Sequence, residues 1–306
     1  MQNETLEMFV QQTKNFLEKR NWTANRLAKS AGISPATISQ IMSMAYPGDI
    51  DEMKRKISSV IIRETERNDC LRTHTAFINT TISKRYFDMA KACHLYNEIG
   101  VCFSAAGLGK TISGREYARQ NPDVIFIEAD PGYTASYFIA KIAAKIGVSP
   151  EKKILPKLTD EVIEKLANSG RLIIIDEAEQ LPYKALETAR RICDKGNVGV
   201  LLTGMHKLLN NLRGHRDQYS QLFNRVGMAT RLEPLTESDT KLILSTVFLL
   251  DTSSIWPVFH RECGGITRRL YKIIARSQMI AAANNACEID EDVVKKASEL
   301  VKIERM

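Results

Sequence analysis

The sequence lacks the features that would place it outside the ordinary globular proteins. Glycine and proline are scarce, at 16 and 9 of 306 residues, which excludes collagen-like and low-complexity chains. No apolar stretch approaches the roughly 18 residues that mark a membrane-spanning helix. No repeat of about 20 to 50 residues marks a solenoid. At about 100 to 200 residues per domain, the length predicts two or three folded domains.

Cysteine pairing and a secretion signal are also missing. The six cysteines include no Cys-x-x-Cys pair, so neither a zinc site nor a disulfide framework is indicated. A signal peptide begins with a basic segment and an apolar run, whereas this chain has Glu4 and Glu7 near its start. We therefore expect reduced thiols and a cytoplasmic protein that does not bind membranes.

The charge balance is moderately basic. Lysine and arginine number 43 and aspartate and glutamate 36, which gives a net charge of +7 and an isoelectric point near 9.0. The excess is spread along the chain and forms no basic tail. A polyanionic partner is compatible with this charge, but the charge alone does not identify one.

The pattern of apolar residues divides the chain into three parts. Residues 1–68 are helical in pattern, and short apolar runs then alternate with amphipathic helices, as in a parallel sheet buried on both faces. The predicted strands are 100–103, 124–127, 172–175, 198–202 and 226–232, and later helices are expected near 236–250, 266–283 and 290–303. We assign 1–68 to an all-α domain, 69–84 to a linker, 85–234 to an α/β core and 235–306 to a helical lid.

Residues 104–111 predict a phosphate-binding loop. They follow an apolar run and precede a predicted helix over 112–119, which is the context that a P-loop requires. Backbone N–H groups would wrap the phosphates of ATP, Lys110 would reach the β- and γ-phosphates, and Thr111 would ligate Mg²⁺. The pattern normally begins with glycine, where this chain has Ser104, and a strand-to-helix turn with a chance lysine is the alternative. The candidate nucleotide-binding residues of the loop are Ser104, Ala105, Ala106, Gly107, Leu108, Gly109, Lys110 and Thr111.

Two acids end the third predicted strand. Asp176 and Glu177 follow Lys110 by 66 and 67 residues. Asp176 would orient Mg²⁺, and Glu177 would polarise the water that attacks the γ-phosphate. We therefore expect hydrolysis of ATP and not binding alone.

Three weaker candidates fit the same scheme. Thr203, at the end of the fourth strand, could sense the γ-phosphate or simply be a structural threonine. Arg225 could stabilise transition-state charge, with Arg216 as a competitor. Arg268, in the Gly-Ile-Thr-Arg stretch that opens a lid helix, could reach back to the nucleotide, and the adjacent Arg269 competes for that role.

Together, the five strands, these motifs and the helical lid resemble the AAA+ ATPases over about residues 85–306. The resemblance implies ring or helical oligomers whose active sites form between subunits. Under that arrangement Arg225 would be supplied to a neighbouring subunit's site.

The N-terminal residues 23–42 predict two short helices that meet at a tight turn. Gly32 would supply the permissive φ, Ser34 would cap the second helix and Pro35 would begin it. This looks like a helix-turn-helix of the phage-repressor type, whose second helix would present Thr37 and Gln40 to base edges. Residues 31–48 contain no charged side chain, however, so weak non-specific DNA contact or a protein-docking role stays open.

A helix-turn-helix followed by an AAA+ core is similar to the target-capture ATPases of phage transposition systems. The resemblance implies a phage- or element-encoded protein of the bacterial cytoplasm that forms an ATP-dependent filament on double-stranded DNA. It would deliver that DNA to a transposase for DNA integration, and the transposase would trigger ATP hydrolysis and release. The candidate DNA-facing loop contains Lys152, Lys153 and Lys157, and an ordinary solvated loop is its alternative.

Two other functions share these motifs. A helicase-loader or initiator-like ATPase would have the same core but act on a replicative helicase. A nucleotide-sensing helix-turn-helix regulator would give a defined footprint on DNA and would tolerate the loss of Glu177.

Overall fold

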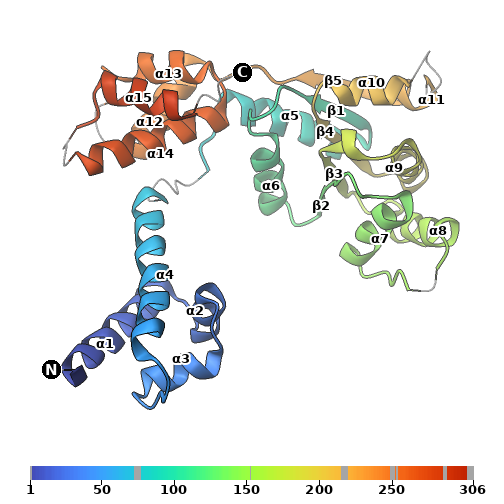
Figure 1. Ribbon diagram of the computed structural model, residues 1–306. Coiled ribbons are helices and arrows are strands. Elements are labelled where there is room, and N and C mark those ends of the chain that lie inside the picture. The colour runs from blue at the N-terminus through green and yellow to red at the C-terminus, as the bar shows by residue number, and fades with distance from the viewer. Residues whose placement is uncertain are drawn as a thin grey trace. The chain divides into compact units, whose positions relative to one another are not determined.

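The structure is a computed structural model that describes residues 2–71, 77–151, 153–214, 220–248, 252, 254–284 and 288–301. The chain forms two compact units, Met1–His74 and Thr75–Met306, each of which is described by itself below (Figure 1). None of the described helices is both long and apolar enough to cross a membrane.

The N-terminal unit is a small helical bundle. Its helices are α1 (Gln2–Arg20), α2 (Ala24–Ala31), α3 (Pro35–Met42) and α4 (Ile50–Leu71). Each helix contributes to one apolar core, with Val10, Leu27, Ile38 and Ile57 almost fully buried. Burial of this shared core holds the four helices together.

The turn between α2 and α3 has the local chemistry that the sequence predicts. Gly32 has a φ of 66°, in the left-handed region that glycine tolerates best. The side chain of Ser34 accepts a hydrogen bond from the Thr37 N–H at 3.0 Å, and Pro35 begins the helix. Asp49 likewise caps α4, because its Oδ1 accepts from the Glu52 N–H at 2.9 Å.

The second unit is built on a five-stranded parallel sheet. The strands are β1 (Ile99–Phe103), β2 (Val124–Glu128), β3 (Leu172–Asp176), β4 (Gly199–Gly204) and β5 (Val226–Arg231), and their order is β2-β3-β4-β1-β5. All five agree with the predicted runs. In such a sheet the carboxyl ends of the strands share one edge, where ligands bind in open α/β folds.

Helices cover both faces of the sheet. They are α5 (Thr81–Tyr96), α6 (Lys110–Gln120), α7 (Ala135–Lys145), α8 (Leu155–Leu166), α9 (Tyr183–Gly196), α10 (Lys207–Arg213) and α11 (Ser220–Phe223). Along β3, Ile173 and Ile175 join an apolar cluster with α7, α8 and α9, whereas Leu172 and Ile174 join one with α5, α6 and the lid. This alternation explains the continuous apolar run, because both faces of β3 are buried.

The lid contains α12 (Glu237–Phe248), α13 (Trp256–Cys263), α14 (Thr267–Ala283) and α15 (Glu291–Val301). Three of these match expected helices, and α13 was not expected. Its short run is bounded by Pro257 in the first turn and by Gly264, whose φ is 58°. Helices α4 and α5 also extend into the range 69–84 that we assigned to a linker.

One buried aspartate joins the lid to the start of α5. Asp239 of α12 accepts hydrogen bonds from the Thr81 N–H at 2.8 Å and from the Thr236 N–H at 3.0 Å. The hydroxyl groups of the same two threonines donate to it as well, at 2.5 and 2.8 Å. Asp239 therefore accepts N–H groups at the starts of two helices that lie far apart in the sequence, and with Thr236 it forms a capping box at the start of α12.

Candidate nucleotide site

The P-loop lies between β1 and α6, at the carboxyl edge of the sheet. Gly107 and Gly109 have φ values of 83° and 97°, so the loop turns through backbone conformations that other residues rarely adopt. The helix begins at Lys110, and the Gly109 carbonyl accepts from the Ser113 N–H at 3.0 Å. Free N–H groups at the start of α6 make this turn suited to an anion.

The ammonium of Lys110 is held inside the loop by three oxygens. Its Nζ donates to Ser104 Oγ at 2.9 Å, to the Ala105 carbonyl at 3.1 Å and to the Ser104 carbonyl at 3.4 Å. Burial lowers the pKa of Lys110, while the nearby acids Asp176 and Glu179 oppose that shift. The serine that stands in place of glycine therefore supplies a direct partner for the lysine.

Asp176 is completely buried at the end of β3. Its Oδ1 accepts a hydrogen bond from Thr203 Oγ1 at 2.6 Å, so the structure brings these two predicted residues together. Its Oδ2 is buried with no hydrogen-bond partner among the described residues. A carboxylate oxygen in this position, with the Thr111 hydroxyl at the start of α6, supplies the hard oxygen ligands that Mg²⁺ prefers.

Glu177 has an unusual backbone conformation beside Asp176. Its φ of 53° and ψ of 36° lie in the left-handed region, which a glutamate rarely adopts. Burial raises its pKa, and the neighbouring acids Glu179 and Asp176 add to this effect. Strained residues cluster at functional sites, and a raised pKa suits a group that accepts a proton.

The start of α14 contacts the P-loop directly. The Arg268 N–H donates to the Gly107 carbonyl at 2.9 Å, and Thr267 Oγ1 donates to the Leu108 carbonyl at 3.3 Å. A Cβ on Gly107 would lie 3.1 Å from Ile266 Cγ2 and 3.2 Å from Arg268 Cβ. The structure thus brings the backbone of Arg268 to the nucleotide loop, and a role of its side chain at the nucleotide stays a prediction.

Arg225 is not part of this site within its own chain. It comes directly before β5, whose first residue Val226 pairs with Ile99 at the start of β1. Because the P-loop leaves the other end of β1, Arg225 and the P-loop lie at opposite ends of the sheet. Its side chain is 61% exposed, and its Nε lies 3.9 Å from Asp194 Oδ2. Its competitor Arg216 lies outside the described residues.

The predicted DNA-binding residues differ in their surroundings. Lys152 lies outside the described residues. Lys153 pairs with Glu161, so its charge is matched within the protein. Lys157 is exposed on α8 and has no ion pair with a described residue. In the N-terminal unit, the Thr37 hydroxyl lies 2.9 Å from the Ser34 hydroxyl, whereas the Gln40 side chain is exposed on α3.

One buried acid of the site was absent from the sequence predictions. Glu179 is only 5% exposed, and its Oε1 accepts from the Met205 N–H at 3.0 Å. The signal was the second glutamate of Asp176-Glu-Ala-Glu179. From the sequence alone, an acid three residues after Asp176 is expected on the surface. The short 3₁₀ turn Ala178–Gln180, which buries it, is seen only in the structure.

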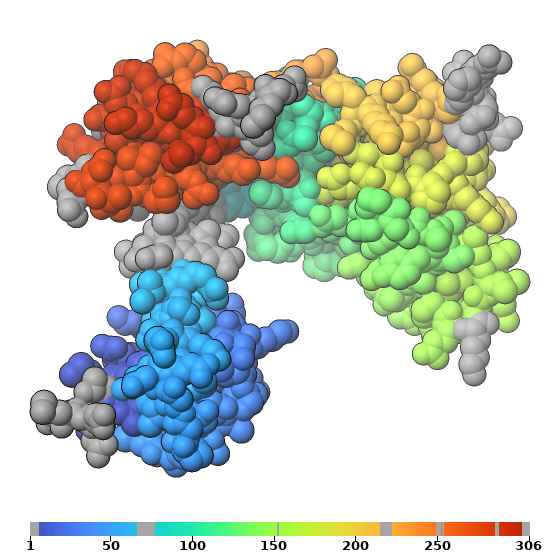
Figure 2. All heavy atoms as spheres, viewed as in Figure 1, coloured from blue at the N-terminus to red at the C-terminus, as the bar shows by residue number. Residues whose placement is uncertain are grey.

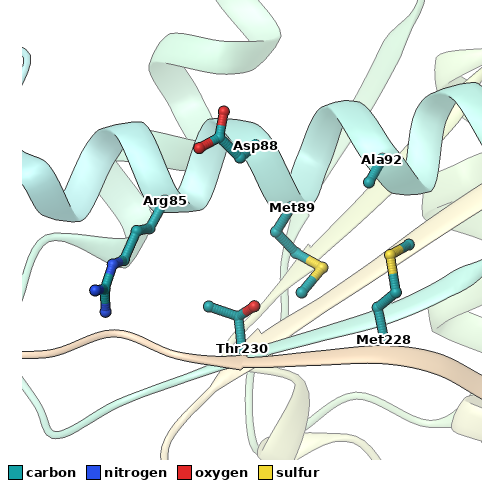
Figure 3. A pocket seen from close by; sticks show the side chains of 6 residues that line it. All are labelled: Arg85, Asp88, Met89, Ala92, Met228 and Thr230. Carbon is teal, nitrogen blue, oxygen red and sulfur yellow. The ribbon is translucent and has the colours of Figure 1, made fainter.

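A separate groove of about 430 Å³ lies between α5 and the edge strand β5. Figure 3 shows Arg85 and Asp88 on α5, with Met89 facing Met228 and Thr230 on β5. Its single arginine, Arg85, points away from Asp88 in Figure 3, and neither a P-loop residue nor Asp176 lines the groove. The groove therefore does not compete with the P-loop as a phosphate site.

Comparison with known proteins agrees with this geometry. The AAA domain family model matches residues 94–212. The chain is 25% identical over 238 residues to the Mu-like prophage FluMu DNA transposition protein B of Haemophilus influenzae, covering 76% of this chain and 83% of that protein. It is also 25% identical over 236 residues to the ATP-dependent target DNA activator B of Escherichia phage Mu, covering 75% of this chain and 74% of that protein. The chain is therefore similar to these two phage-related B proteins over about three quarters of its length.

Solved structures agree on the fold. The Aeropyrum pernix ORC2 protein in its ADPNP–ADP complexes superposes with a TM-score of 0.54 at 16% identity, covering 71% of this chain and 66% of that one. A Drosophila ORC structure bound to DNA gives 0.51 at 11% identity, covering 78% of this chain and 66% of that one. The second unit therefore has the AAA+ P-loop NTPase fold.

Proposed function

We propose that this protein is an ATP-dependent DNA-binding ATPase that captures target DNA for a transposase. ATP binding would allow copies of the chain to assemble on double-stranded DNA, and hydrolysis would release that DNA. The observation that carries the proposal is the P-loop and Asp176–Thr203 pair in a chain homologous to the B proteins of phages, one of which is named a target DNA activator. Such proteins would act in the cytoplasm of a phage's bacterial host.

The chain's own residues account for the steps of hydrolysis. Lys110 would exchange its loop oxygens for phosphate oxygens, which are stronger partners because they are charged. Thr111 and Asp176 would hold Mg²⁺, which neutralises phosphate charge when bound. Glu177 would accept the proton of the attacking water, and Thr203 would fix the orientation of Asp176.

Arg225 makes the site dependent on assembly. Since Arg225 lies at the end of the sheet opposite its own P-loop, it would reach a γ-phosphate only in a neighbouring copy. An arginine supplied in this way raises hydrolysis rates by about 10³- to 10⁵-fold in other NTPases. We therefore expect the isolated chain to hydrolyse ATP slowly and the oligomer on DNA to hydrolyse it faster.

The proposed DNA-binding surface lies on α7 and the start of α8. Residues 131–150 contain Lys141 and Lys145 but no acid, and Lys157 follows on α8. Lys141 Nζ lies 5.0 Å from the ring centroid of Tyr137, which is 48% exposed. Figure 2 shows the green and yellow-green atoms of α7 and α8 forming one continuous surface. The spaced lysines Lys141, Lys145 and Lys157 suit a phosphate backbone, and the exposed acids Glu151 and Asp160 lie beside the part of the surface that holds Lys157.

The N-terminal unit would contribute less to affinity. Gln40 is better placed than Thr37 to contact a base edge, because the Thr37 hydroxyl is already paired with Ser34. The uncharged second helix adds no phosphate contact of its own, so we propose contact with little sequence preference.

DNA binding with and without ATP tests this function. Fluorescence anisotropy of a labelled duplex should show tight binding with ATP and Mg²⁺, weaker binding without nucleotide, and a loss of affinity as salt rises. Lys110→Ala should remove the effect of ATP, while Lys195→Ala, on the exposed end of α9, serves as the charge-matched control. Equally tight binding with and without ATP in the wild type would refute the proposal.

A further inference from the structure

Glu179 is a buried acid beside the nucleotide site whose role is unexplained by the steps above. It lies in the short turn Ala178–Gln180 that follows Asp176 and Glu177, and it is 5% exposed. Oε1 accepts the Met205 N–H at 3.0 Å. Oε2 is buried and has no hydrogen-bond partner among the described residues. A buried carboxylate is costly unless its contacts serve a purpose.

The peptide unit between Gly204 and Met205 is bonded on both sides. Its N–H donates to Glu179, and its carbonyl accepts from the Ser104 N–H at 3.1 Å. Because a peptide unit is planar, its N–H and carbonyl cannot turn independently. The position of the Glu179 carboxylate therefore fixes the acceptor that holds the first residue of the P-loop.

Ser104 connects the Gly204–Met205 peptide to Lys110. Its Oγ and its carbonyl both accept from Lys110 Nζ, at 2.9 and 3.4 Å. A continuous series of hydrogen bonds thus runs from Glu179 through the Gly204–Met205 peptide and Ser104 to Lys110. The bond from the peptide N–H to the carboxylate is charge-assisted, which makes it stronger than a bond between neutral groups.

Gly204 is required for this approach. A Cβ at that position would lie 2.0 Å from Glu179 Oε2 and 3.0 Å from its Cδ. No side chain larger than hydrogen fits while the carboxylate stays in place. The backbone carbonyl of Glu179 also accepts a hydrogen bond, from Nδ2 of Asn211 on α10 at 2.9 Å. This bond holds the backbone of the turn in place.

We infer that Glu179 is a positioning residue of the nucleotide site, which holds the Gly204–Met205 peptide and, through it, the P-loop end at Ser104 and Lys110. The inference rests on the ATPase part of the proposed function and not on DNA capture. It assigns Glu179 no contact with ATP or with the attacking water.

Three variants separate this role from simple packing. Glu179→Ala removes the acceptor of the Met205 N–H, and we expect the affinity for a fluorescent ATP analogue to fall about 10- to 100-fold, with KM for ATP rising in parallel. Glu179→Gln keeps an oxygen that can accept the N–H, so affinity and KM should return to within about threefold of the wild type. Gly204→Ala displaces the carboxylate and should reproduce the alanine defect with Glu179 intact. Glu164→Ala and Glu164→Gln, at an exposed position of α8, are the matched controls.

The measurements use the full chain without DNA. Wild-type affinity and KM in Glu179→Ala would overturn the inference, as would a Glu179→Gln variant as impaired as Glu179→Ala. If Glu179→Ala fails to fold, the nucleotide affinities of Gly204→Ala and Glu179→Gln decide the matter. A weaker affinity in Gly204→Ala than in Glu179→Gln supports the inference, and equal affinities overturn it. Melting temperatures check that both variants are folded. Failure of the wild type to bind DNA would refute the proposed function but would leave these nucleotide affinities interpretable.

Discussion

Replacing Asp239 with alanine should destabilise the second unit and loosen the attachment of the lid. The carboxylate caps both α5 and α12 through the Thr81 and Thr236 N–H groups, at 2.8 and 3.0 Å. Loss of one hydrogen bond to an N–H at a helix start costs about 1 kcal/mol, so the loss of both gives about 2 kcal/mol. For a unit of this size, that corresponds to a fall in melting temperature of about 4–8 °C.

The effect should depend on pH with a defined sign. Burial raises the pKa of Asp239, but the hydrogen bonds from Thr81 and Thr236 outweigh it, and the pKa is lower than usual. A carboxyl group with a lowered pKa in the folded state contributes stability that is complete above its unfolded pKa of about 3.9. That contribution is lost as the pH falls through the folded pKa, because the protonated group accepts these hydrogen bonds less well.

Urea denaturation from pH 7 to pH 3 measures both parts of the prediction. The difference in unfolding free energy between the wild type and Asp239→Ala should be constant at neutral pH and should shrink below about pH 4. Glu237→Ala, two residues away and exposed on the same helix, is the matched control and should change little. A wild-type denaturation midpoint for Asp239→Ala at pH 7, or a difference that stays constant down to pH 3, would refute the double-cap reasoning.

Other parts of the structure lead to three further predictions. Arg225→Ala should lower DNA-stimulated phosphate release by at least about 100-fold with nucleotide affinity unchanged. The control Arg231→Ala, at the other end of β5, should keep the wild-type rate. Equal rates of phosphate release in the two variants would show that Arg225 has no part in hydrolysis. Gly107→Ala combines a strained φ with contacts of 3.1 to 3.2 Å to the lid, so nucleotide affinity should fall about tenfold in a titration. Burial raises the pKa of Cys93 and Cys102 to about 12, so a thiol reagent at pH 8 should label them only after unfolding, as peptide mass mapping would show.

The sheet was predictable because each strand is a short apolar run. For β3 both faces are buried, so residues 172–175 are apolar without interruption and stand out in the sequence. The P-loop was predictable for a related reason, since Gly107 and Gly109 occupy left-handed backbone positions that few other residues tolerate. Caps such as Ser34 were found because their side chains act on N–H groups only three residues away.

The missed features depend on contacts between distant parts of the chain. The burial of Glu179 is explained by its hydrogen bond from the Met205 N–H. The burial of Asp239 is explained by its bond from the Thr81 N–H, which is 158 residues away. No local pattern reports such pairs. Helix α13 was missed because its eight residues are too few to establish a period, although Gly264 marks its end. The distance of Arg225 from its own P-loop required the strand order and register, which a single sequence does not contain.

The apolar cluster shared by α5, α6 and the lid limits how the second unit can be divided. Leu172 and Leu201 of the sheet belong to the same cluster as Phe259 and Leu270 of the lid, and all four are completely buried. A shortened protein that ends before α12 would keep α5 and α6 on this side of the sheet but would expose the apolar side chains of the cluster that pack against the lid, and it would aggregate. The α/β core and the lid should consequently melt in a single cooperative transition, and motion of the lid during turnover would be confined to small tilts about that shared interior.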